Sequence, residues 1–419
     1  MKIVLVSDFL PYIHNTWSGA ELVCWKLGKL LEKENYDVKY ITLKDSQKTN
    51  SENIFFVRSL FSKQQFIGKN FILDIVAFIS IFSILKKIKP DIVHIHAKLL
   101  FFPVAISALI LNIPYFFTVL DYYILCPRNI LLRPNGELCN YNHGPHCDDC
   151  FCLSEREAIK VAIRFLPRAF KKILCIMRKY SVDYFMNKAF KIITFSQASK
   201  NRLLKYGYPR DKIEIIYHYQ FETTNYEPAL NKRQDGKKIL FVGSLTEHKG
   251  LHIIIEAMNE VVLQLPDVKL LVVGKGNDNY TNYINKLIKE HSVEKHIDFL
   301  GHKNNEDVIK LIKEVDIVVV PEQWYSEFGP VILIEAKLSG KPVVASSIGS
   351  IPEYIRDGVD GILVTYNRSE EFSKSIIKLL KDPSLIHSMG ESISENIYNV
   401  TKTEEMLARL ERLYTKSIK

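Results

Sequence analysis

The stretch "VDIVVVPEQWYSEFGPVILIEAKLSGKPVVAS", residues 315–346, has the pattern of a strand, a helix and a second strand. The runs "DIVVVP" and "KPVVAS" are short and rich in β-branched residues, which favours strands. The longer segment between them leaves room for a crossover helix. Repeated units of this kind form parallel sheets that helices cover on both faces. The stretch therefore predicts a doubly wound α/β fold.

The same alternation runs through both halves of the chain. Strand runs are expected at 2–8, 36–42, 91–96, 115–121, 191–196 and 213–218, and again at 237–244, 269–275, 297–302, 316–321, 341–346 and 360–364. We expect an N-terminal domain at 1–222, a polar linker at 223–236, a second domain at 237–385, and C-terminal helices at 386–419 that cross back to the first domain. Ligands of such sheets bind outside the carboxyl ends of the strands, so two facing domains predict a cleft.

Composition limits the class of protein. With 419 residues, 47% of them hydrophobic and 25% charged, the chain is expected to be a soluble protein of two or three domains. Pro103, Asn112 and Pro114 divide the apolar run 99–119, which favours a helix and a buried strand over a membrane span. The N-terminal "MKIVLVSDF" does not resemble an export signal, so a cytoplasmic location with reduced cysteines is expected.

The segment "EFGPVILIE" begins and ends with a carboxylate, Glu327 and Glu335. Pro330 fits the first turn of a helix, which puts Glu327 on the preceding loop and Glu335 inside the helix. The free N–H groups of that first turn favour an anion. The pair therefore predicts a clamp for a ligand that is both polyhydroxylated and negatively charged. The alternative is an exposed loop glutamate and a solvated helical glutamate.

Other strand ends carry small or cationic residues. Lys249 follows a strand run in "FVGSLTEHKGL", where a lysine beside helix N–H groups suits a phosphate, and Gly19 precedes a helix in "NTWSGAE". Together with "VVGKG", "PDIVHIH" and residues 315–364, these motifs closely resemble the glycosyltransferases of family 4. The resemblance covers essentially the whole chain. It implies the GT-B fold, in which two Rossmann-like domains face each other across a cleft. The domain at 1–222 would then be the acceptor-side domain, and the domain at 237–385 the nucleotide-sugar-binding domain.

The resemblance implies a retaining hexosyltransferase. Such an enzyme moves a sugar from a nucleotide-diphosphate sugar to a hydroxyl of a glycan or lipid-linked acceptor, in cell-surface polysaccharide synthesis, and needs no metal for the transfer. The implied catalytic residues are Glu327 for the donor sugar, Lys249 for the departing diphosphate, and Asp121. The implied donor-binding residues are Gly19, Gly243, Ser244, Lys249, Gly274, Phe328, Gly329, Pro330, Val331 and, for the ribose, Glu335. A non-catalytic nucleotide-sugar binder and a nucleotide-sugar 2-epimerase-like isomerase are the alternatives.

The chain departs from the family pattern on the donor side and on the acceptor side. Many relatives have arginine where this chain has Ser244, and Lys275 and Arg356 are the candidates to replace that cation. The motif T-x-H-D reads "TVLD", with Leu120 in place of the histidine and Asp121 retained. Three histidines near strand ends are either partial replacements or packed side chains: His14, His94 and His96.

Residues 151–200 hold eleven Lys and Arg against three Asp and Glu, a local charge of +8 in a chain of net charge +9. Cations recur there at helical spacing at Arg164, Arg168, Lys171, Lys172, Arg178 and Lys179, and an apolar face is formed by Ile163, Leu166, Phe170, Ile173, Leu174 and Met177. This pattern predicts peripheral binding to the inner membrane surface through residues 155–190. The alternative is an apolar face packed on the first domain with solvated cations. Nucleic acid is not an expected partner, since no aromatic-interleaved basic motif is present.

A cysteine cluster follows Asp121. Its members are Cys126, Cys139, Cys147 and Cys150, and the last two have the C-x2-C spacing that lets two thiolates bind one tetrahedral ion. The loop is long and offers little regular structure, so a structural zinc is predicted to tie it. The alternatives are unliganded buried thiols, or a set in which Cys152, His143 or His146 replaces one cysteine.

Overall fold

The computed structural model describes residues 1–14, 19–44, 52–59, 74–126, 129, 131–133, 135–141, 143–153, 167–217, 237–325, 330–400 and 403–418. The chain divides into two compact units, Met1–Gln220 with Thr403–Lys419, and Phe221–Lys402. The predicted linker 223–236 lies outside the described residues. Among the two C-terminal helices, α13 (Pro383–Val400) belongs to the second unit and α14 (Thr403–Ile418) to the first.

The first unit is built on a parallel seven-stranded sheet of order β3-β2-β1-β4-β5-β6-β7. Its strands are β1 (Lys2–Val6), β2 (Asp37–Leu43), β3 (Ile54–Val57), β4 (Ile92–Ile95), β5 (Tyr115–Thr118), β6 (Lys191–Thr194) and β7 (Ile213–Ile215). Every predicted run forms a strand, and β4 and β5 are buried along their whole length, as expected for inner strands of a parallel sheet. The sequence did not reveal β3, a four-residue strand at the sheet edge.

Helices and short 3-10 turns connect these strands. They are α1 (Gly19–Lys33), α2 (Ile75–Ile88), α3 (Phe101–Ile110), η2 (Tyr122–Ile124), η3 (Pro145–Cys147), α4 (Asp148–Leu153), α6 (Arg168–Lys188), α7 (Gln197–Lys205) and η4 (Arg210–Lys212). The apolar run 99–119 forms α3 and the buried strand β5, as predicted. No helix in the described part of the chain is both long enough and apolar enough to cross a membrane.

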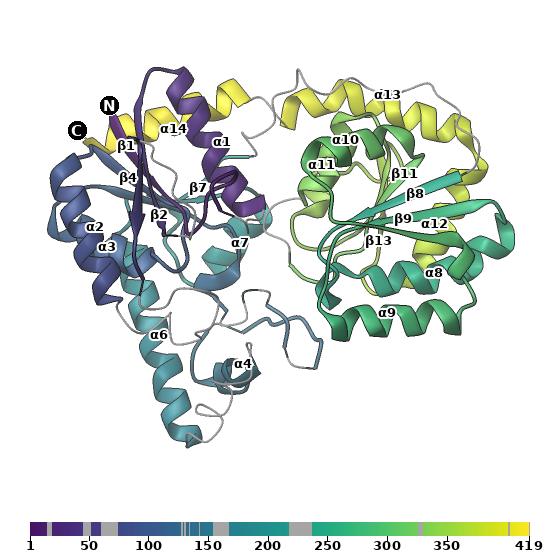
Figure 1. Ribbon diagram of the computed structural model, residues 1–419, viewed down its shortest axis with the longest axis horizontal. Coiled ribbons are helices and arrows are strands. Elements are labelled where there is room, and N and C mark those ends of the chain that lie inside the picture. Colours follow the sequence, from purple (N-terminus) through teal and green to yellow (C-terminus); the bar gives the residue numbers. More distant parts are fainter. Residues whose placement is uncertain are drawn as a thin grey trace. The chain divides into compact units, whose positions relative to one another are not determined.

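The second unit has a parallel six-stranded sheet of order β10-β9-β8-β11-β12-β13. Its strands are β8 (Lys237–Val242), β9 (Val268–Val273), β10 (Ile297–Gly301), β11 (Ile317–Val320), β12 (Val343–Ser346) and β13 (Gly361–Val364). Its other helices are η6 (Glu247–Lys249), α8 (Leu251–Gln264), α9 (Asp278–Glu290), η7 (Glu294–His296), α10 (Asn305–Glu314), α11 (Val331–Leu338), η8 (Ile351–Glu353) and α12 (Ser369–Lys381). In Figure 1, α8, α9 and α12 lie on one face of this sheet, and α10, α11 and α13 on the other. Both units are thus doubly wound and Rossmann-like, as predicted.

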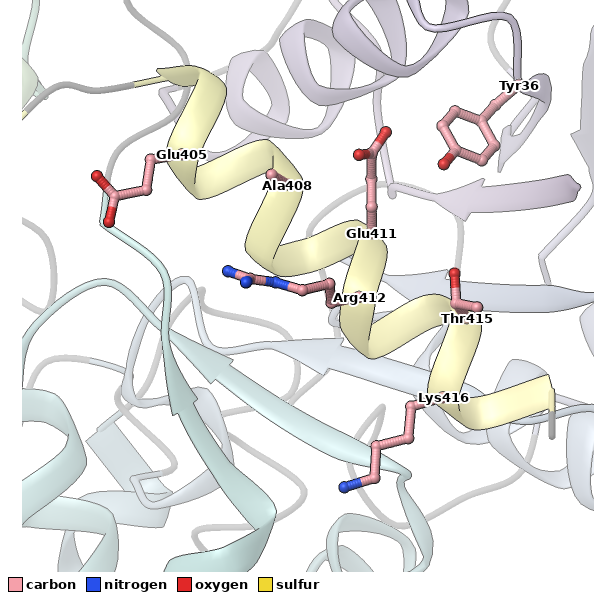
Figure 2. A pocket seen from close by; sticks show the side chains of 7 residues that line it. All are labelled: Tyr36, Glu405, Ala408, Glu411, Arg412, Thr415 and Lys416. Atoms are coloured by element: carbon pink, nitrogen blue, oxygen red, sulfur yellow. The ribbon is translucent and has the colours of Figure 1, made fainter.

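The C-terminal helix α14 is anchored in the core of the first unit. The Tyr414 hydroxyl, fully buried, lies 2.5 Å from His94 Nδ1, and His94 Nε2 lies 2.6 Å from Thr118 Oγ1. Arg409 adds an ion pair of 3.1 Å with Glu214. A hollow of about 570 Å³ lies along α14. Figure 2 shows the side chains that line it: Tyr36, Glu405, Ala408, Glu411, Arg412, Thr415 and Lys416. Tyr36 precedes β2, so the hollow lies at the amino end of the sheet, away from the strand ends where ligands bind in this fold.

Candidate active site

The loop after β8 holds the predicted phosphate-binding lysine in a fixed position. Lys249 Nζ lies 2.6 Å from Glu322 Oε1, and Glu322 follows the neighbouring strand β11. The Trp324 indole N–H donates to the other oxygen of Glu322, and the Trp324 ring lies 5.5 Å from the ammonium. Lys249 is therefore paired rather than freely solvated. Sequence reasoning missed Glu322 and Trp324, although a carboxylate directly after a strand run was a usable signal.

Two glycines allow the ends of β8 and β9 to approach each other. A side chain at Gly274, where φ is +150°, would place its Cβ 1.8 Å from the Gly243 carbonyl oxygen. A Cβ at Gly243 would lie 3.8 Å from Lys249 Cδ. Gly250, with φ of +75°, packs against the Pro321 carbonyl in the same way, since a Cβ there would lie 1.8 Å from its oxygen. The structure therefore brings Gly243, Gly274 and Lys249 together at one sheet edge.

The second predicted carboxylate is buried on α11. The helix begins at Val331 with Pro330 as its N-cap residue, which confirms the predicted helix start. Glu335 is 4% exposed and accepts a hydrogen bond of 2.6 Å from Asn305 Nδ2. The alternative of a solvated helical glutamate is therefore wrong. Glu327, Phe328 and Gly329 lie outside the described residues.

The missing arginine at Ser244 has one candidate replacement left. Arg356 forms an ion pair of 2.9 Å with Asp360 and donates to the Ser392 carbonyl. Because these two partners hold its guanidinium, Arg356 is not the replacement for the arginine. Lys275 is exposed, and its carbonyl accepts from the Leu245 N–H at 2.9 Å. Lys275 therefore lies beside the loop that carries Ser244, which is itself exposed.

The first sheet also carries charged residues at its carboxyl edge. Asp121, which follows β5, forms an ion pair with Lys98, which follows β4. The Asp8 carboxylate, which follows β1, accepts hydrogen bonds from the Lys98 and Leu99 N–H groups at 2.8 and 3.0 Å. Burial raises the pKa of Asp8 although these backbone N–H groups oppose the shift. Of this set only Asp121 was predicted. Gly19 begins α1 in the same unit.

Two of the three strand-end histidines are packed structural residues. His14 Nδ1 accepts from the Leu10 N–H at 2.9 Å, its Nε2 lies 2.8 Å from the Leu43 carbonyl, and His94 bonds Tyr414 and Thr118. His96 is different: neither of its ring nitrogens has a hydrogen-bond partner within the described residues. Leu120, which stands in the place of the family histidine, is buried.

Comparison with known proteins shows the family of the chain. The family described as Glycosyltransferase Family 4 matches residues 17–218, and the family described as Glycosyl transferases group 1 matches residues 222–398. The chain belongs to the GT-B glycosyltransferases. This glycosyltransferase is 30% identical over 220 residues to an uncharacterized glycosyltransferase of Methanocaldococcus jannaschii, an alignment that covers 50% of the chain and 55% of that relative.

A second relative and a solved structure extend the comparison. The D-inositol 3-phosphate glycosyltransferase of Corynebacterium aurimucosum is 28% identical over 216 residues, covering 48% of the chain and 51% of the relative. The chain thus matches about half the length of these curated relatives. Anabaena HepE, solved in complex with UDP-glucose, has a TM-score of 0.72 at 18% identity, covering 99% of the chain and 100% of HepE. At that identity the likeness shows the fold.

In this glycosyltransferase the cysteine cluster does not form a ready metal site. Cys126, Cys147 and Cys150 are buried, and Cys139 is half-buried. Within the described residues, no group of three or more His, Cys, Asp or Glu side chains is arranged to hold a metal ion. Burial raises the pKa of the Cys147 thiol to about 11, and the nearby Cys126 and Cys139 add to the shift. This arrangement does not support the four-thiolate zinc, which stays a prediction for metal analysis to test.

A buried polar network ties the cysteine-bearing loop to α6 instead. Arg178 donates to His143 Nδ1 at 3.1 Å and to the Tyr123 carbonyl, and both partners lie on the loop. Because arginine only donates, His143 carries its proton on Nε2, which lies 3.3 Å from Asp183 Oδ1. Tyr208 donates to the same oxygen at 2.7 Å. Arg178 was predicted to belong to the membrane-facing cations, with a solvated cation as the alternative, and both are wrong for this residue: the side chain is 2% exposed.

Proposed function

We propose that this protein is a retaining glycosyltransferase that moves a sugar from a nucleotide-diphosphate sugar to a hydroxyl of a glycan or lipid-linked acceptor, in cell-surface polysaccharide synthesis. The observation that carries the proposal is the edge formed by Gly243, Gly274 and Lys249 at the carboxyl ends of β8 and β9. There, two glycine-containing strand ends lie close together beside a positioned ammonium, at the sheet edge where this fold binds ligands, and this arrangement supports binding of a diphosphate.

Some residues of the second unit bind the donor, and others act in catalysis. Lys249 acts where charge develops, on the departing diphosphate, so its contribution is largest in the transition state. Glu335, oriented by Asn305, accepts hydrogen bonds from the ribose hydroxyls. For Glu327, Phe328 and Gly329, which lie outside the described residues, the proposed roles are those that the family resemblance implies: Glu327 binds the hydroxyls of the donor sugar, and the N–H groups of the other two bind the sugar and its phosphates. The transfer itself needs no metal.

Three substitutions separate these roles in steady-state kinetics. Glu327→Ala and Lys249→Ala each lower transfer by at least about 100-fold, the scale for loss of a transition-state contact. Glu335→Ala mainly raises KM for the donor. Lys303→Ala serves as the matched control, since Lys303 is exposed and follows the edge strand β10. A Glu327→Ala enzyme with the wild-type rate would remove that residue from the site.

A panel of nucleotide sugars tests the reaction class. The purified protein is incubated with each donor, with and without glycan and lipid-linked acceptors, and free nucleoside diphosphate is measured. The proposal predicts release that depends on acceptor. A sugar altered without acceptor identifies the 2-epimerase-like isomerase, and binding without turnover of any donor identifies a nucleotide-sugar binder.

We further propose that α6 lies on the inner membrane surface. Phe170, Ile173, Met177, Tyr180 and Tyr184 recur at intervals of three and four residues, and each is 46–70% exposed. The buried residues of the helix, among them Cys175 and Val182, lie on its opposite face. The alternative of an apolar face packed on the first domain therefore fails for Phe170, Ile173 and Met177. Ile163, Arg164 and Leu166 lie outside the described residues.

Exposed apolar side chains beside Lys171 and Lys172 suit anionic lipid, whereas Arg168 is paired with Asp148 at 2.7 Å. In Figure 1, α6 projects beyond the sheet of its unit. Vesicle co-sedimentation measures this binding, which should require anionic lipid and weaken with salt. Ile173→Glu with Met177→Glu should abolish it at unchanged Tm, whereas Asn201→Glu, on an exposed position of α7, should not. Equal binding to neutral vesicles would contradict the electrostatic part.

A further inference from the structure

Three adjacent strands of the first sheet end in residues that contact one another. The strands β1, β4 and β5 are neighbours in the sheet, and Asp8, Lys98 and Asp121 follow them in turn. The Asp8 carboxylate accepts from three backbone N–H groups at the start of the β4–α3 loop, at 2.8–3.2 Å, and Lys98 Nζ pairs with Asp121. The edge is therefore one connected polar surface whose groups are held in place.

Tyr123 brings an unused hydroxyl to this surface. Its N–H donates to Asp121 Oδ1 at 2.9 Å, its carbonyl accepts from Arg178, and the Arg178 guanidinium lies 5.6 Å from its ring. Both the backbone and the ring of Tyr123 are thus held in place. Tyr123 is only 4% exposed, yet its hydroxyl has no hydrogen-bond partner in the described part of the chain. Burial raises the pKa of this hydroxyl; the charge of Arg178 opposes the shift, and the charges of Asp8 and Asp121 add to it.

A buried hydroxyl without a partner is rare, because it loses its bonds to water and gains none. His96, which follows β4 at the same edge, is a second such group, with both ring nitrogens unpaired within the described residues. Two buried polar side chains without partners, at the sheet edge that carries Asp8, Lys98 and Asp121, are better explained by a ligand than by folding. The side chain at position 120, where relatives place a histidine, is a buried leucine and supplies no hydrogen bond.

We propose that Tyr123 recognises the acceptor, by a hydrogen bond between its hydroxyl and an acceptor hydroxyl next to Asp121, and that Lys98 is a positioning residue that orients the Asp121 carboxylate. This inference rests on the proposed function of sugar transfer. The edge has two carboxylates and one ammonium, so it suits an uncharged sugar ring or polyol rather than a phosphate. Tyr123 thereby supplies the hydrogen bond that Leu120 cannot.

Tyr123→Phe removes only the unpaired hydroxyl. The variant should therefore keep its thermal stability but lose activity with the acceptor. A hydroxyl without a protein partner contributes nothing to the fold, so the variant should melt at or above the wild-type Tm. Tyr115→Phe is the matched control, because the Tyr115 hydroxyl, also buried, donates to the Phe185 carbonyl. The control should melt lower. A fall in the Tm of Tyr123→Phe as large as that of the control would overturn the inference without any knowledge of substrates.

The kinetic measurement uses the donor and acceptor that the wild-type protein turns over in the panel. Tyr123→Phe should lower kcat/KM for the acceptor about 10- to 100-fold, with the dissociation constant for the nucleoside diphosphate released in the panel changed by less than about two-fold in calorimetry. Tyr115→Phe should change neither. Lys98→Met should lower acceptor kcat/KM at least about 10-fold, and Lys98→Arg should restore most of it, since the guanidinium can hold the same carboxylate. Full acceptor efficiency in Tyr123→Phe overturns the inference, whereas a wild-type protein that turns over no donor overturns the proposed function.

Discussion

Replacing Lys249 by alanine tests a structural and a chemical role of one side chain. The change leaves the Glu322 carboxylate, which is 4% exposed, without its cation. Breaking a fully buried ion pair costs about 3–5 kcal/mol. Because the Lys249 side chain is 24% exposed, water replaces part of the lost interaction, and we expect a loss of about 2 kcal/mol. For a unit of this size that loss lowers Tm by about 4–8 °C.

The double variant Lys249→Ala, Glu322→Gln separates the two roles. Neutralising the carboxylate removes the unpaired charge while the side chain can still accept from Trp324, so stability should return to within about 0.5 kcal/mol of wild type. Transfer should stay at least about 100-fold low, because the cation for the diphosphate is still missing.

Differential scanning calorimetry and initial transfer rates measure both effects on the same samples. Lys310→Ala is the matched control: its side chain is 71% exposed and lies 3.7 Å from Asp307, so Tm should change by less than about 1 °C. Recovery of transfer in the double variant would show that Lys249 acts only by pairing with Glu322. A wild-type Tm for Lys249→Ala would show that the ion pair contributes nothing.

The remaining predictions concern the first unit. Tyr414→Phe leaves the buried His94 Nδ1 without its partner and should cost about 1–3 kcal/mol in urea unfolding, and an unchanged midpoint would show that α14 does not depend on this bond. Burial lowers the pKa of His96 to about 3 and holds the pKa of His94 well below its usual value near 6.5, so in this range mainly the unfolded chain takes up these protons. Stability should therefore fall as pH decreases from about 6.5 toward 3, and less steeply in His96→Phe; an equal slope would rule out His96 as a cause. For the cysteine cluster, the zinc prediction requires one zinc per chain in protein purified without added metal. The double variant Cys147→Ser, Cys150→Ser should lose both the zinc and thermal stability. Metal-free wild-type protein whose Tm equals that of the zinc-supplemented protein would contradict the prediction.

The strands could be predicted because their sequences are continuous β-branched and apolar runs. β11 and β12 are examples, with every residue buried. β3 was missed because a four-residue strand at the edge, with only Val57 fully buried, leaves a weak pattern. The start of α11 was predictable from Pro330, since proline restricts its own backbone and that of the residue before it.

Side-chain partners from distant parts of the chain could not be predicted in this way. Periodicity puts Arg178 among the cations of α6, but its position depends on His143 and Tyr123, which lie far away in the sequence. Lys98 and Glu322 follow predicted strands, so the strand-end rule could have included them. Their pairing with Asp121 and Lys249 depends on which strands are adjacent, and the sheet order is known only from the fold.

The central claim is that the site at the ends of β8 and β9 transfers a sugar with retention. NMR spectroscopy of the reaction mixture tests this most directly, because one series of spectra follows the donor anomeric signal, the released nucleoside diphosphate and the anomeric configuration of the product. The account predicts that product and nucleoside diphosphate appear together and only with acceptor, that the new linkage has the configuration of the donor, and that Lys249→Ala abolishes both signals. A product of inverted configuration, or a donor converted to another nucleotide sugar without acceptor, would contradict it.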